Sequence, residues 1–209
     1  MRNVMRPALL LALAALVLGG CAERYHFRPL RDDEAAVLVA ASSGLLPPVD
    51  YLGAGPSCQI GAAINEVPVR DVEMLPATSP ADCVLIYATT GALDLPQREL
   101  RALMAHGLAH LALGHARTTG RRVSFSGRRA TAEGDPQQRI YSVQEETEAD
   151  RYAARLLNVT AAGGAGCPAL GEVLARIRAE GGRWSAWTEQ HPLGETRGAS
   201  ARGFCAGGR

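Results

Sequence analysis

The sequence predicts an α+β domain, because a segment with strand patterns is followed by segments with helical patterns. Residues 60–69 contain stretches that alternate between apolar and polar side chains, and residues 83–87 form a short apolar run rich in β-formers. Apolar residues at helical spacing begin near Pro96 and recur twice later in the chain. Strands followed by helices are typical of the α+β class.

The predicted helices carry recognisable start and stop signals. Pro96 suits the first turn of a helix, and Gly114 suits a helix end. Ser142 followed by Glu145 forms a capping box, in which each side chain bonds to the other residue's backbone N–H. Helices are expected at residues 32–41, 96–113, 142–157 and 168–180.

Two polar segments are expected on the surface. Residues 117–136 are rich in Arg, Gly, Ser and Thr, which predicts an exposed, mobile loop. Residues 194–209 form a Gly/Arg/Ser-rich tail, which Cys205 would tie down. The formal net charge of the whole chain is only +1, so nucleic acid is not expected as a partner.

The N-terminus resembles a bacterial lipoprotein signal. Arg2 and Arg6 precede an apolar stretch at residues 7–18, which is too short to span a membrane. It ends in Leu18-Gly19-Gly20-Cys21, which is similar to the lipobox that precedes a lipidated cysteine. An ordinary secretory signal that happens to contain a cysteine is the alternative.

The lipobox resemblance implies a division of the chain and a location for it. Residues 1–20 would be a removed signal peptide, residues 21–57 a lipidated N-terminus and lead-in, and residues 58–209 the folded domain. Cys21 would anchor the protein to a membrane of the bacterial envelope, facing the periplasm. Ala22, in place of the aspartate that marks inner-membrane retention, favours the outer membrane.

Four cysteines remain after Cys21, and an even number in an exported domain predicts two disulfides. Three connectivities are possible. Cys58–Cys83 and Cys167–Cys205 are favoured, because each bond closes a local segment of chain. A cysteine metal site is the weaker alternative, since no pair has CxxC spacing.

Two histidines lie four residues apart on the strongest predicted helix. His106 and His110 are about 40° apart around a helix, so their imidazoles leave one face and can supply two ligands of a tetrahedral Zn²⁺. His115 is rotated by about 180° from His106 on a continuous helix, which excludes it as a ligand. An HxxxH pair alone is weak evidence, because packed helices also carry histidines.

A carboxylate on the next helix strengthens the metal hypothesis. Glu146 and Asp150 again share one helix face; Glu146 would complete a His₂Glu site and Asp150 could hydrogen-bond a ligand histidine. The alternative is a solvated acidic face followed by Arg151 and Arg155.

These motifs together resemble the HtpX/CAAX-prenyl-protease family of gluzincin zinc metallopeptidases, including its periplasmic lipoprotein branch. Residues 105–115 match the family pattern AHE-A-H---GH except at Gly107, and residues 146–150 match ExxAD fully. Residues 84–95 resemble its strand and Thr-Gly turn, and His191-Pro192 with Arg197 resembles HP----R. The resemblance covers about residues 60 to 200.

The resemblance implies a zincin-like fold, in which a small sheet packs over the active-site helix and a second helix carries a ligand. His106, His110 and Glu146 would bind zinc, with Asp150 supporting them. An extended or unfolded polypeptide would pair with the sheet edge. Residues 83–87 are the candidate strand beside the site.

Gly107 occupies the place of the family's general-base glutamate, and it has no side chain to move a proton. Loss of a general base typically slows a reaction by about 10²–10⁴-fold. Glycine also costs a helix about 1 kcal/mol relative to alanine, so helix stability does not explain it. Glu145 and Glu148 lie about 100° and 200° around the helix from Glu146, so neither is expected to face the metal.

The sequence leaves open the role of His191 and whether the chain has peptidase activity. His191 would be a fourth ligand, a donor to an oxyanion or to bound water, or a structural residue before Pro192. Three functions follow. The first is a pseudo-peptidase that binds zinc and unfolded envelope polypeptides, the second an active zinc metalloendopeptidase in envelope quality control, and the third a structural lipoprotein without metal.

Overall fold

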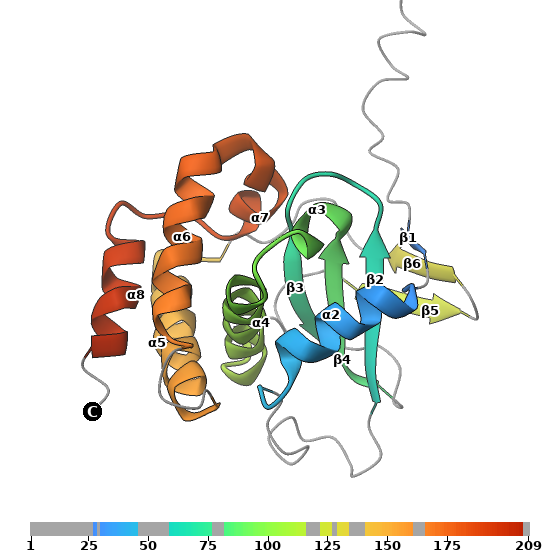
Figure 1. Cartoon of the computed structure of the whole chain (residues 1–209), viewed down its shortest axis with the longest axis horizontal. Helices are drawn as coiled ribbons and strands as arrows, with labels where there is room; N and C mark the ends of the chain where they lie inside the picture. Colours follow the sequence, from blue (N-terminus) through green and yellow to red (C-terminus); the bar gives the residue numbers. More distant parts are fainter. Residues whose placement is uncertain are drawn as a thin grey trace, which may run out of the picture.

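The computed structural model has an α+β architecture, in which a four-stranded mixed sheet packs beside a group of helices (Figure 1). The structure describes residues 27–28, 30–45, 59–76, 82–115, 122–126, 129–133, 141–160 and 166–206. The strands of this sheet are β1 (Phe27–Arg28), β2 (Gln59–Asn65), β3 (Val72–Pro76) and β4 (Asp82–Thr89). Their order is β1-β2-β4-β3, with β2 and β4 parallel and the two outer strands antiparallel to their neighbours.

The four predicted helices are confirmed to within a few residues. The helices are α2 (Asp32–Ser42), α3 (Thr90–Leu93), α4 (Gln97–Ala112), α5 (Val143–Thr160), α6 (Pro168–Glu180), α7 (Ser185–Gln190) and α8 (Arg197–Ala206), with a 3-10 turn η4 (Gly181–Trp184) before α7. The predicted capping box also forms. The Ser142 backbone N–H donates to the Glu145 carboxylate at 2.8 Å, and the Glu145 N–H donates to Ser142 Oγ at 3.2 Å.

The core lies between one face of the sheet and the helices. Alternate strand residues, among them Ile64, Met74 and Ile86, form an apolar layer in one core cluster with α2 and α4. In Figure 1, α4 lies between the sheet and the group formed by α5, α6 and α8. Every residue from Ala102 to His110 is buried as a result. Side chains on all sides of α4 are therefore withdrawn from water.

The prediction of a loop for residues 117–136 is wrong. Within residues 117–136, β5 (Arg122–Ser126) and β6 (Arg129–Glu133) pair as an antiparallel hairpin where a loop was expected. The polar composition of the segment concealed strands whose backbone groups pair with each other. The tail from residue 194 is tied down by Cys205, and its described residues are mostly exposed or half-buried, as expected. It also contains a helix that was not expected, α8, whose first residue, Arg197, is buried.

The segment before residue 58 contributes to the same core. β1 pairs with β2, and Leu38 and Ala41 of α2 are buried in the cluster that α4 also joins. Residues 1–20, which were expected to be a signal peptide, Cys21 and Cys58 lie outside the described residues, and so does the expected Cys58–Cys83 pair. The described helices are all too short or too polar to cross a membrane.

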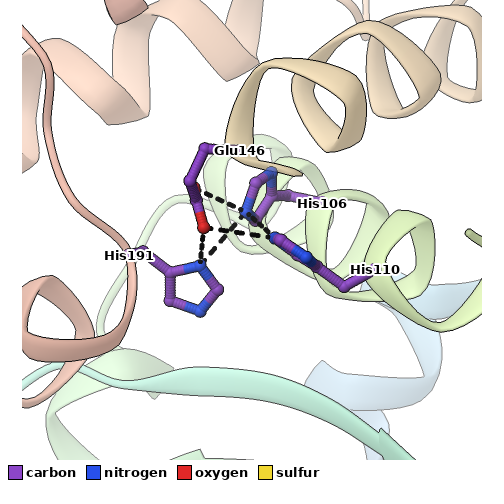
Figure 2. Close-up of side chains that lie close together, drawn as sticks. All are labelled: His106, His110, Glu146 and His191. Atoms are coloured by element: carbon purple, nitrogen blue, oxygen red, sulfur yellow. Dashed lines mark hydrogen bonds and ion pairs between the residues drawn. The ribbon is translucent and has the colours of Figure 1, made fainter. Parts of the chain in front are cut away.

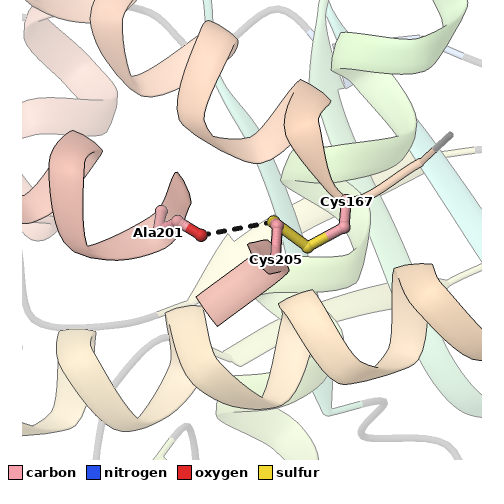
Figure 3. Close-up of a disulfide and its surroundings, with 3 residues drawn as sticks. All are labelled: Cys167, Ala201 and Cys205. Carbon is pink, nitrogen blue, oxygen red and sulfur yellow. Dashed lines mark hydrogen bonds between the residues drawn. A yellow bond between two sulfur atoms is a disulfide. The ribbon is translucent and has the colours of Figure 1, made fainter. Parts of the chain in front are cut away.

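The predicted Cys167–Cys205 disulfide is confirmed. It joins the start of α6 to the end of α8, with Cα atoms 5.5 Å apart (Figure 3).

Candidate metal centre

Four side chains from three parts of the chain converge on one point (Figure 2). His106 and His110 come from α4, Glu146 from the first turn of α5, and His191 directly follows α7. One donor atom from each residue lies within 4.8 Å of the others, and all four residues are buried. The first three residues are the ones expected from the sequence, and His191 joins them.

The distances between donor atoms fit a small tetrahedral cation. His106 Nε2 lies 3.0 Å from His110 Nε2 and 3.3 Å from His191 Nδ1. Glu146 Oε1 lies 3.3 Å from His110 Nε2 and 2.8 Å from His191 Nδ1. Four ligands about 2.0–2.1 Å from a zinc ion would be about 3.3–3.4 Å apart at the corners of a regular tetrahedron. This buried group could therefore hold a metal ion of that size.

The local sequence explains how the four residues are positioned. The four-residue spacing puts both imidazoles of α4 on one face, one turn apart. The Ser142 cap fixes the start of α5, which places Glu146 in its first turn. The His191 backbone N–H donates to the Trp187 carbonyl at 3.0 Å, and the His191 ring stacks on the Trp187 indole at 4.4 Å. Backbone and ring contacts thus both orient His191.

A buried ion-pair network surrounds the donors. Asp150 Oδ1 lies 2.9 Å from His106 Nδ1, so the carboxylate can accept the proton of the ring nitrogen that faces away from the cluster. Arg197 Nε donates to Asp150 Oδ2 at 2.7 Å, and Arg197 Nη1 forms an ion pair with Glu146 Oε2. The guanidinium therefore connects the carboxylates of Asp150 and Glu146.

No role for Arg197 or Tyr141 follows from the sequence alone. Tyr141 stacks on the His110 ring with ring centroids 3.8 Å apart, although it belongs to no recognisable sequence motif. The HP----R resemblance was the one available signal for Arg197, because it links this residue to His191. Tyr141 precedes the cap residue of α5, which is a position without a chemical signature in the sequence.

Burial and neighbouring charges set the protonation states of the four donor residues. Burial lowers the pKa of His110 to about 2 and also lowers the pKa of His191, so both imidazoles are neutral. Burial opposes ionisation of Glu146, but the neighbouring histidines hold the pKa of its carboxyl below its usual range. Burial likewise opposes protonation of His106, yet Asp150 and Glu146 outweigh it and raise the pKa of that ring. Neutral imidazoles and an ionised carboxylate are the forms that bind metals, so His110, His191 and Glu146 are ready to bind, whereas His106 must release a proton when a metal binds.

Gly107 lies on the side of α4 that packs against strand β3. A Cβ atom at this position would be 2.9 Å from the Met74 backbone nitrogen and 3.0 Å from Met74 Cγ. Met74 belongs to β3, so the strand beside the site is β3 and the expectation for residues 83–87, now in β4, is wrong. Close approach of a strand explains the glycine, which helix propensity did not.

Substitution of Gly107 by Ala is expected to destabilise the protein by about 1–3 kcal/mol, because the new methyl group overpacks against Met74. Gly203 is the matched control. It is an exposed helical glycine of α8 with nothing within 4 Å of its Cβ position, so Gly203→Ala should be neutral or stabilise by up to about 1 kcal/mol. Denaturant unfolding measures both. Equal stabilisation by the two substitutions would contradict the packing account.

The structure overturns the geometric reason for excluding His115. The helix ends at Ala112, and Gly114 adopts a φ of 78°, which turns the chain back toward the site. His115 Nδ1 consequently lies 3.2 Å from His110 Nδ1. His115 is still outside the four-residue cluster. Glu145 caps α5 and Glu148 lies near His115, so neither belongs to the cluster either.

Comparison of the sequence with known protein families finds no matching family, and comparison with characterised proteins finds no match.

Proposed function

We propose that this chain is a zinc-binding pseudo-peptidase, a lipoprotein of the bacterial envelope with a zincin-like fold related to the HtpX/CAAX-prenyl-protease family. The main supporting observation is that a Cβ atom at position 107 would lie only 2.9 Å from the Met74 backbone nitrogen. The general-base position has no side chain, and the space that a side chain would need is filled by β3.

Zinc is the metal that the donor set favours. Three imidazoles and one carboxylate, at spacings near those of a tetrahedron, match the nitrogen and oxygen ligands that zinc takes. Zinc sites with four protein ligands are usually structural, whereas catalytic sites keep a position for water. With His191 as the fourth donor, a bound ion would cross-link α4, α5 and the segment after α7.

The two acidic groups of the buried ion-pair network, Asp150 and Glu146, do not replace the missing base. Asp150 is held by His106 and Arg197, and Glu146 is itself a donor of the cluster. A general base must reach the proton of the attacking water and be free to accept it. Among the described residues, Glu146 and Asp150 already have other partners, which supports binding without efficient hydrolysis.

An extended or unfolded polypeptide is the proposed partner, held near the membrane through Cys21. The outer position of β3 in the described sheet supports this, because an extended chain can pair with an edge strand. The lipobox-like end at Cys21 and the family resemblance are the other support. In a peptidase that kept the general base, a polypeptide paired with this edge strand would lie beside the zinc as the substrate.

The test is to purify the chain from Ala22 onward and measure its zinc content and its cleavage of an unfolded protein such as reduced casein. One zinc per chain and no chelator-sensitive cleavage are expected. Glu146→Gln and His110→Ala are expected to lose zinc, which ties the metal to this site. Chelator-sensitive cleavage by the native chain would instead establish the active peptidase. If the chain takes up no zinc, the remaining hypothesis is a structural lipoprotein without metal.

Zinc is also expected to raise the melting temperature. Free zinc at 1,000 times its dissociation constant adds about 4 kcal/mol to the free energy of unfolding. For a domain of this size, that corresponds to a rise of roughly 8–16 °C. Calorimetry with and without a chelator measures it. The shift should vanish in Glu146→Gln, and a shift that persists there would assign the zinc to another site.

A further inference from the structure

The two ring nitrogens of each α4 histidine face different partners. His106 Nε2 and His110 Nε2 point into the cluster, 3.0 Å apart. On the far side, His106 Nδ1 meets Asp150 at 2.9 Å, and His110 Nδ1 meets His115 Nδ1 at 3.2 Å. Both histidines therefore have a hydrogen-bonding partner on the nitrogen that the cluster does not use.

His115 continues this contact toward the surface. Its Nε2 atom lies 3.4 Å from Glu148 Oε2, whose side chain is 43% exposed, whereas the side chain of His115 is 10% exposed. The chain of groups thus runs from a solvent-exposed carboxylate through His115 to His110. It connects α5, which carries Glu148 and Glu146, with the end of α4.

The positions of the ring protons determine which group donates each hydrogen bond between His110 and Glu148. For Nε2 of His110 to offer a lone pair to a metal, the ring proton must be on Nδ1, from where it can donate to His115 Nδ1. His115 then carries its own proton on Nε2, facing Glu148. The arrangement is self-consistent, because every nitrogen between the cluster and the surface has one defined role.

We propose that His115 is a positioning residue, which fixes the tautomer and the ring orientation of His110 so that Nε2 is ready to bind zinc. Glu148 is the outermost group of this hydrogen-bonded chain, at the surface. This inference rests on the proposed zinc site and deepens it, since it adds a partner for the second α4 histidine. Groups that orient a ligand histidine in this way typically contribute about 10–100-fold to metal affinity.

The turn at Gly114 is what brings His115 within reach of His110. On an uninterrupted helix, His115 would be rotated by about 140° from His110 and could not reach its ring. The left-handed conformation of Gly114, with a φ of 78°, breaks the helix and returns the next residue. This conformation suits glycine, because a Cβ atom is strained there.

The experiment compares His115→Phe, His115→Gln and Glu148→Ala with the native chain from Ala22 onward. A chelator competition gives the dissociation constant for zinc. His115→Phe is expected to bind zinc about 10–100-fold more weakly. His115→Gln should stay close to the native affinity, because its amide oxygen can accept from His110 and its NH₂ group can face Glu148. Glu148→Ala, an exposed change that leaves the fold intact, should weaken binding by a smaller factor.

A second measurement separates positioning from general stability. Imidazole ¹⁵N chemical shifts of the metal-free protein report which nitrogen of His110 carries the proton. The native chain and His115→Gln should show the proton on Nδ1, and Glu148→Ala should show a less uniform tautomer. Unchanged zinc affinity in both His115→Phe and Glu148→Ala, with the His110 proton on Nδ1 throughout, would overturn the inference while leaving the proposed zinc site in place.

Failure of the zinc site itself is distinguishable. A native chain that binds no zinc would refute the proposed function, and the tautomer of His110 in the metal-free protein would still decide the role of His115. If His115→Phe does not fold, Glu148→Ala and His115→Gln provide the same comparison.

Discussion

Replacing Arg197 with Met is expected to lower the free energy of unfolding of the metal-free protein by about 3–5 kcal/mol. Arg197 is 7% exposed and forms ion pairs with both Asp150 and Glu146, each only 1% exposed. Removal of the guanidinium leaves two carboxylates buried without their shared cation. Breaking a buried ion pair by removing one partner is costly because the remaining charge has neither water nor a counter-ion.

Denaturant unfolding of Arg197→Met measures the effect, and the melting temperature should fall by roughly 6–20 °C. Arg155→Met is the matched control, because Arg155 is an exposed arginine of α5 and its loss should change stability by about 0.5 kcal/mol or less. Zinc should reduce the cost of Arg197→Met, since a bound cation would compensate part of the charge of Glu146. A cost below about 1 kcal/mol without zinc would be incompatible with the buried network.

Loss of the Cys167–Cys205 disulfide is expected to be comparably severe. The bond closes 38 residues of sequence, and the entropy of loop closure then predicts a stabilisation of about 4 kcal/mol. The disulfide holds the end of α8 against the start of α6 (Figure 3). Because α8 begins at Arg197, a loosened α8 should also weaken zinc binding.

The double substitution Cys167→Ser with Cys205→Ser tests this without a reductant. Its free energy of unfolding should fall by about 2–4 kcal/mol, and its dissociation constant for zinc should rise. Reductant applied to the double variant is the control, because any further loss then belongs to another disulfide. A double variant as stable as the native chain would show that packing of α8 alone is sufficient.

The helical part of the fold could be predicted because its signals are local. The four-residue spacing of His106 and His110 and the capping box at Ser142 depend on helix geometry, which neighbouring residues set. The hairpin of β5 and β6 and the helix α8 escaped prediction, since a polar composition hides elements that form by backbone pairing or by tertiary packing.

The candidate site was predictable in its motifs but not in its full membership. His106, His110 and Glu146 stand out by spacing, whereas the sequence left His191 undecided between ligand and structural residue. Arg197 contacts His106, which is 91 residues away in the sequence, and Tyr141 contacts His110, which is 31 residues away. Such contacts depend on how α7 and α8 pack, which no local pattern records.

The sequence alone shows which reactive groups are present: two histidines on one helix face, a carboxylate on the next helix, and a glycine directly after the first histidine. The tertiary structure decided what surrounds them. It put Met74 against Gly107, brought His191 and Arg197 to the carboxylates, and turned His115 back onto His110. The reason is physical, because side-chain identity and helical period are fixed along the chain, while the space left for a side chain is fixed by the elements that pack around it.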